Sequence, residues 1–201
     1  MAFLQGVLLG LPLALLIGPV LFTLLQGSLR HGWRGGMAVA VGITVSDIVA
    51  VALLLWGAGD WLTSENVQWW LAVMAAVLLT GLGLRYLIKP PVTMEQPKVT
   101  KRGLLIWAVQ GYLVNFVNPA VFAIWLGYLG YATGEYGEDG RAIFLIGVIT
   151  SVFITDALKA IFADKLLGLL KPAWLRKFYL AIGILLIGAA IFVLWRLWVG
   201  A

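Results

Sequence analysis

The sequence predicts an all-α integral membrane protein with six transmembrane helices arranged as two inverted three-helix repeats. Hydrophobic residues make up 62% of the 201-residue chain and charged residues 11%. Soluble domains are about 45–50% apolar and about 25% charged, so most of the surface of this chain is expected to face lipid. The other two observations are six apolar segments of spanning length and a pattern of proline, glycine and aspartate that occurs twice.

Each predicted span meets the length that a bilayer demands, about 20 mostly apolar residues. The spans are Phe3–Leu29, Gly36–Ala58, Val67–Ile88, Gly103–Ala132, Ala142–Ala163 and Ala173–Val199. The first, fourth and sixth are longer than a straight crossing needs, so we expect them to tilt, break or extend into the interface. The first lacks a basic flank and exceeds the apolar core of a signal peptide, and we interpret it as a span rather than a cleaved leader.

Basic residues are concentrated in alternate loops. Most of them lie in segments 30-34, 85-102 and 164-177, whereas the other loops carry Asp60, Glu65, Glu135, Glu138 and Asp139. The positive-inside rule therefore places the basic loops in the cytoplasm and both termini outside. This distribution also accounts for the net charge of +5, so we expect no nucleic-acid partner.

The two halves of the chain repeat one another. The matched positions are Gly18-Pro19 with Asn118-Pro119, Phe22 with Phe122, Gly27 with Gly127, and Ser46-Asp47 with Thr155-Asp156. A proline-containing cytoplasmic linker, 89-102, separates a first repeat, 1-88, from a second, 103-201. Because each half contains an odd number of spans, the second half must cross in the opposite sense. Such inverted repeats are typical of secondary transporters.

Asp47 lies near the middle of the second predicted span. An ionised carboxylate at that depth costs about 2.5–3.5 kcal/mol on insertion scales. The cost falls if the carboxylate faces water or a partner, or if it takes up a proton. We therefore interpret Asp47 as a candidate proton-coupling residue, with a hydrogen-bonded packing anchor between helices as the alternative.

Asp156 is the counterpart of Asp47, and Lys159 follows it at i+3 on the same helix face. An ion pair between them would lower the cost of burying both. Lys159 could instead extend toward the cytoplasmic end or pair with Asp47. The sequence leaves these three arrangements open, and all three residues are candidates for proton coupling.

Pro19 and Pro119 are expected to interrupt the first helix of each half, because proline removes a backbone donor and clashes with the preceding turn. Broken helices at mid-membrane expose N–H and C=O groups that bind zwitterions and ions. An ordinary proline kink is the alternative at each position. The candidate substrate-binding residues are Gly18, Pro19, Asn115, Asn118, Pro119, Thr44, Ser46 and Thr155.

Reactive side chains are scarce. The chain has no cysteine and one histidine, His31, in a predicted loop. Thiolate metal sites and disulfides are thereby excluded, and catalysis that needs an imidazole or thiol within the membrane has no base. We therefore expect that the protein has no cofactor and no resident metal, and that it is not an enzyme.

Several of these motifs occur together in a known family. Ile17-Gly18-Pro19, Gln26-Gly27-Ser28 and the segment 42–47 resemble the first half of the lysine-exporter (LysE/RhtB) translocators, and 115–119 resembles the signature in their second half. The resemblance covers nearly the whole chain. It implies an inner-membrane exporter of amino acids or similar small solutes, driven by an ion gradient. The family commonly has lysine after Asn-Pro, where this chain has Ala120, so the identity of the cargo stays open.

The leading hypothesis is therefore a proton-coupled exporter of amino acids or similar metabolites that works by alternating access. A divalent-cation exporter is the alternative, because two carboxylates with amide and hydroxyl oxygens suit a hard cation. The partners expected are the small solute, protons and membrane lipid. Glycines in the first and sixth spans also leave a homodimer open.

Overall fold

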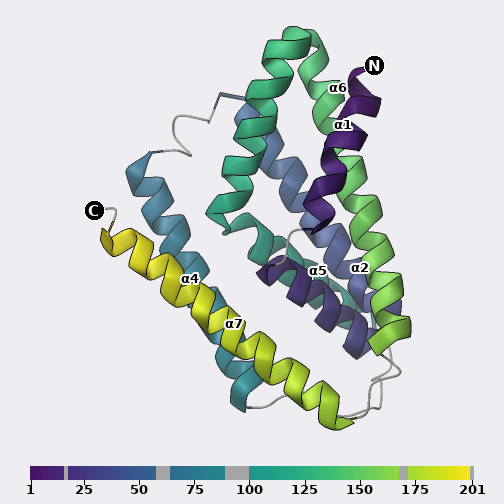
Figure 1. Ribbon diagram of the computed structural model, residues 1–201, viewed down its shortest axis with the longest axis vertical. Coiled ribbons are helices and arrows are strands. Elements are labelled where there is room, and N and C mark those ends of the chain that lie inside the picture. The colour runs from purple at the N-terminus through teal and green to yellow at the C-terminus, as the bar shows by residue number, and fades with distance from the viewer. Residues whose placement is uncertain (16–17, 58–63, 89–99, 168–171, 200–201) are drawn as a thin grey trace.

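Figure 1 shows the computed structural model of the chain, which describes residues 1–15, 18–57, 64–88, 100–167 and 172–199. The elements are α1 (Ala2–Gly10), the 3₁₀ helix η1 (Leu11–Leu15), α2 (Pro19–Leu55), α4 (Glu65–Ile88), α5 (Lys101–Phe116), α6 (Pro119–Leu167) and α7 (Pro172–Val199). These ranges contain no strand, so the all-α prediction is confirmed. Asp60, most of linker 89-102 and part of segment 164-177 lie outside the described residues.

Within the described ranges, three helices are long and apolar enough to cross a membrane: Pro19–Leu55, Glu65–Ile88 and Ala120–Ala163. Two shorter apolar helices are Ala2–Ala14 and Tyr179–Trp195. The boundaries of the predicted spans therefore differ from those of the observed helices. The first span is split between α1, η1 and the start of α2, and the fourth is split between α5 and the start of α6.

Both predicted prolines mark a helix start rather than a kink inside a continuous helix. Pro19 is the first residue of α2, after Gly18 in extended backbone (φ −170°, ψ −174°). Pro119 is the first residue of α6, where the Asn118 Oδ1 atom accepts a hydrogen bond from the Ala120 N–H at 3.1 Å. Proline suits the first position of a helix, because the N–H group that proline lacks would have no hydrogen-bond partner within the helix. The predicted breaks are therefore confirmed at both sites.

Glycine allows α2 and α6 each to turn part-way along their length. Gly32 in α2 has φ 64° and ψ −165°, and Gly137 in α6 has φ 66° and ψ −169°. These left-handed angles favour glycine because it lacks a Cβ atom. In Figure 1, α6 reverses direction at the end of the molecule that also holds the N-terminus. Both halves thus pass through a helix, a break, a helix, a glycine turn, a helix and a final long helix.

The helices cross closely at glycine. α2 packs against α5 and α6, α1 packs against α6, and α4 lies along α7 (Figure 1). A Cβ atom on Gly42 would overlap the carbonyl oxygen of Ala108, and one on Gly6 would overlap that of Phe144. Gly111 approaches Val39 in the same way. Small residues let helix backbones approach each other in membranes, so these glycines set the spacing of α1, α2, α5 and α6.

Gly42→Ala is expected to lower thermal stability, because its methyl group collides with the Ala108 carbonyl on α5. Overpacking of this kind costs about 1–3 kcal/mol. Thermal unfolding of the purified protein in detergent measures the effect. Gly81→Ala in α4 is the matched control, since a Cβ there meets nothing within 4 Å. Equal melting temperatures for the two variants would contradict a tight α2–α5 crossing.

Candidate functional site

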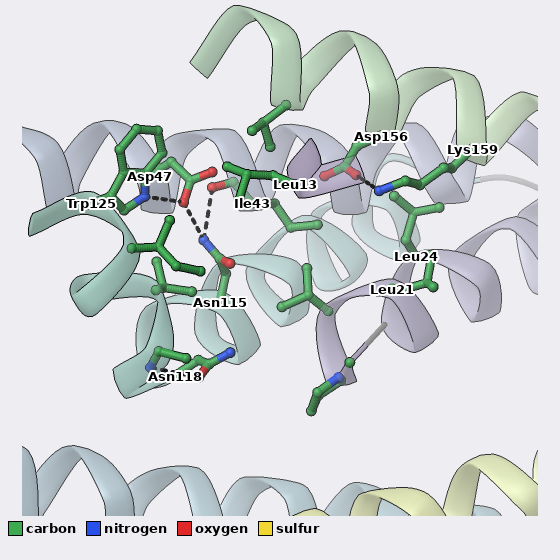
Figure 2. Close-up of a pocket in the computed structure, with 17 residues that line it drawn as sticks. Leu13, Leu21, Leu24, Ile43, Asp47, Asn115, Asn118, Trp125, Asp156 and Lys159 are labelled. Carbon is green, nitrogen blue, oxygen red and sulfur yellow. Dashed lines mark hydrogen bonds and ion pairs between the residues drawn. The ribbon is translucent and has the colours of Figure 1, made fainter. Parts of the chain in front are cut away.

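A cavity of about 330 Å³ lies where the two broken helices meet. It is formed mainly by α2, α5 and α6, with Leu13 of η1. Its volume falls in the range of about 300–1,000 Å³ that is usual for small-molecule sites. The residues of its wall that carry a polar side chain or mark a helix break are Gly18, Pro19, Asp47, Asn115, Asn118, Trp125, Asp156 and Lys159. Figure 2 shows these groups among apolar side chains such as Leu21, Leu24 and Ile43.

Asp47 is held by two N–H donors at one side of the cavity. Its Oδ1 atom accepts hydrogen bonds from Asn115 Nδ2 at 2.8 Å and from Trp125 Nε1 at 3.0 Å (Figure 2). Asp47 is 4% exposed and Asn115 is equally buried. Both partners donate, and hydrogen bonds to a charged acceptor are stronger than those to a neutral one. The arrangement therefore compensates an ionised carboxylate without any cation.

Asp156 is compensated in a different way. Lys159 Nζ lies 2.8 Å from Asp156 Oδ1, so the structure contains the first of the three arrangements that the sequence left open. Asp156 is 6% exposed, and the pair lines the same cavity as Asp47 (Figure 2). The cavity thus contains one carboxylate bound by neutral donors and one carboxylate bound by a cation.

The remaining predicted residues separate into two groups. Gly18, Pro19 and Asn118 line the cavity. Ser46 is not among the lining residues, but its Oγ atom accepts a hydrogen bond from Asn115 Nδ2 at 3.1 Å.

The hydroxyls of Thr44 and Thr155 turn back to their own helices instead. Thr44 Oγ1 donates to the Ala40 carbonyl at 2.9 Å, and Thr155 Oγ1 donates to the Val152 carbonyl at 2.9 Å. Neither threonine is among the cavity-lining residues, because a mid-helix hydroxyl readily bonds a carbonyl three or four residues earlier. The Pro119 side chain lies outside the described residues, although its backbone starts α6.

Trp125 is a site residue that the sequence analysis does not include among its candidates. It lines the cavity, is 2% exposed and donates a hydrogen bond to Asp47. A signal was present, because most tryptophans of the chain fall near span ends, whereas Trp125 lies within a span that also carries two asparagines. A tryptophan N–H away from the interface requires a buried acceptor.

This arrangement can engage both ends of a zwitterion. The Asp47 carboxylate attracts an ammonium group, while the positive N-terminal ends of α2 and α6 attract an anion. Among the described residues, no group of three or more His, Cys, Asp or Glu side chains is arranged to hold a metal ion.

The chain is similar to a known protein family and to named proteins. The model of a family described as LysE type translocator matches residues 11–196. The chain is 24% identical over 180 residues to the Bacillus subtilis (strain 168) protein named "Putative amino acid efflux protein YcgF", covering 87% of this chain and 86% of that protein.

A second relative carries a different kind of name. The chain is 28% identical over 196 residues to "Chemotactic transduction protein ChpE" of Pseudomonas aeruginosa, covering 94% of this chain and 95% of that one. No solved structure matches. The family model spans nearly the whole length, including both helix breaks and both aspartates. The chain therefore belongs to the LysE type translocator family.

Proposed function

We propose that this protein exports amino acids or similar small metabolites across the bacterial inner membrane. The observation that carries the proposal is that Asp47, Asn115 and the Asp156–Lys159 pair line the same cavity, next to the two helix breaks. The family match and the naming of a relative for amino acid efflux support the same solute class. The divalent-cation alternative is not favoured, because Lys159 occupies one of the two carboxylates that would have to bind the ion.

The solute is proposed to bind as a zwitterion. Its ammonium group would approach Asp47, whose carboxylate keeps acceptor capacity beyond the two hydrogen bonds on Oδ1. Its carboxylate would approach the start of α2 at Gly18-Pro19 and the Asn118 amide. Half-helix ends and side-chain amides at mid-membrane are a common way to bind such solutes in transporters.

Proton coupling is proposed to reside mainly at Asp47. A carboxylate that is hydrogen-bonded only by neutral donors can take up or release a proton when water enters or leaves its surroundings. Asp156 has a fixed cation in contact, and we assign this pair a secondary coupling role.

Alternating access is proposed to follow from an inverted repeat. Matching helix breaks at Pro19 and Pro119 and matching glycine turns at Gly32 and Gly137 support this arrangement. The reciprocal packing of α1 on α6 and of α2 on α5 supports it as well. Rocking of one half against the other would expose the cavity to each side in turn.

Proteoliposomes loaded with a panel of amino acids should release one or more of them, and dissipating the proton gradient should slow that release. The Asp47→Asn variant should lose export while it remains folded, because an amide at this position can still accept from Asn115 and Trp125 but cannot carry the proton. Efflux of radiolabelled solute, with gel filtration of each variant, measures both quantities.

Glu65→Gln is the matched control, since it makes the same chemical change at an exposed helix start. It should leave export unchanged. Full export by Asp47→Asn would reject the coupling role, and no efflux of any solute by the native protein would reject the function.

The Asp156–Lys159 pair allows stability and transport to be separated. Lys159→Met leaves a buried carboxylate unpaired, which typically destabilises a protein by about 3–5 kcal/mol. The double variant Asp156→Asn/Lys159→Met should recover most of the melting temperature but export more slowly than the native protein. Native export rates in the double variant would show that the pair is purely structural. The exposed Arg141–Glu138 pair, at 3.4 Å, is the control and should tolerate the equivalent double change.

Membrane orientation can be tested with single cysteines because the chain has none of its own. We expect Glu138→Cys, near the Gly137 turn, to react with a membrane-impermeant thiol reagent in intact cells. Arg34→Cys, near the Gly32 turn, should react only after the membrane is opened. Both native side chains are exposed, so the difference reports sidedness rather than burial. The reverse pattern would contradict cytoplasmic placement of segments 30-34, 85-102 and 164-177.

A further inference from the structure

A second cavity, of about 190 Å³, lies near the Gly32 turn, between the end of α4, the start of α5, the first part of α2 and α7. We refer to it as the Arg30–Arg85 cavity, after the two guanidinium groups on its wall. Among the described residues that line it, none is Asp or Glu. Positive charge therefore faces this cavity with no lining carboxylate against it.

Buried amides add donors to the same cavity. Gln26 is 1% exposed, and its Nε2 atom has no hydrogen-bond partner among the described residues. The Tyr86 hydroxyl donates to Gln26 Oε1, which orients the amide so that the N–H₂ group is left over. The Gln110 side chain also lines this cavity, beside the Tyr86 hydroxyl. Buried polar atoms are almost always satisfied in folded proteins, so the Gln26 amide donor on this wall indicates a missing acceptor.

His31 contributes a further donor. Its Nδ1 atom accepts a hydrogen bond from Trp107 Nε1 at 3.0 Å, so a neutral His31 carries its proton on Nε2. Guanidinium groups, amide N–H₂ groups and an imidazole N–H all donate. A small planar anion with several acceptor lone pairs, such as a carboxylate, is the ligand that this set fits, and arginine binds it through two parallel hydrogen bonds.

The Arg30–Arg85 cavity and the larger cavity at Asp47, called the Asp47 cavity below, are both lined by residues of α2 and α5. The first part of α2 lines the Asp47 cavity at Leu21 and Leu24 and the Arg30–Arg85 cavity at Gln26 and Arg30. On α5, Asn115 lines the former and Gln110 the latter. The two cavities therefore lie at successive positions along α2 and α5.

We propose that the Arg30–Arg85 cavity is an entry site that binds the free carboxylate of the solute before the solute reaches Asp47. The proposal rests on the proposed export function and adds a selection step to it. Solutes with a free carboxylate are recruited by Arg30 and Arg85, whereas analogues that end in an amide are not. Removal of either guanidinium is expected to weaken carboxylate binding about 10- to 100-fold, the usual range for a hydrogen bond to a charged group.

The first test measures binding without transport. Sodium acetate, titrated against sodium chloride of equal ionic strength, should raise the melting temperature of the purified full-length protein. The rise should be lost in Arg30→Gln and Arg85→Gln and kept in Arg34→Gln. Arg34 is the matched control because it lies over the Trp33 ring at 5.6 Å, outside the cavity. Arg30→Lys and Arg85→Lys, which keep the charge, should retain part of the rise and cover the case in which a glutamine variant does not fold.

The second test measures selectivity in proteoliposomes. For an exported amino acid, Arg30→Gln and Arg85→Gln should raise KM about tenfold or more with little change in kcat, while the KM of its C-terminal amide stays as in the native protein. Acetate stabilisation without a KM change would overturn the entry role. Stabilisation by phosphatidylglycerol but not by acetate would assign the cavity to a lipid headgroup and would also overturn it. Native protein that binds acetate but exports no solute rejects the proposed function instead.

Discussion

The structure depends on satisfying the Asp47 carboxylate in an apolar interior. A buried charge without partners is far more costly than any single packing contact, and the partners of Asp47 come from two other helices. Asn115 lies on α5, just before the second helix break, and Trp125 lies on α6, just after it. The carboxylate therefore joins α2 to the helices on both sides of that break.

Glycine makes this geometry reachable. Asp47 and Asn115 can meet only if α2 and α5 cross closely, and Gly42 and Gly111 lie at that crossing with no side chain between the backbones. A similar crossing at Gly6 brings α1 against α6. The proline at the start of each new helix requires no backbone donor. Local backbone chemistry thus allows a broken, tightly crossed core that an ordinary apolar helix bundle would not form.

The two aspartates share one cavity but differ in what neutralises them. Asp47 is bound by neutral N–H donors, whereas Lys159 holds Asp156 in an ion pair. Charge is also divided along the molecule. The Arg30–Arg85 cavity presents donors and positive charge near the Gly32 turn, and the Asp47 cavity presents a carboxylate between the breaks. In the export route that we propose, a zwitterion binds through its carboxylate at the Arg30–Arg85 cavity first and through its ammonium group at Asp47 next.

The sequence by itself determined the all-helical membrane class, the helix breaks at Pro19 and Pro119 and the candidacy of Asp47, because composition and backbone restriction act locally. It could not determine which polar groups meet. The hydroxyls of Thr44 and Thr155 donate hydrogen bonds to carbonyls of their own helices, and Trp125 donates a hydrogen bond to the Asp47 carboxylate. Only the tertiary structure decided these points, since a hydrogen bond between residues 78 positions apart depends on how the helices cross. The choice of Asp156 as the partner of Lys159 also required the fold, because i+3 spacing permits that ion pair but does not exclude the other acids.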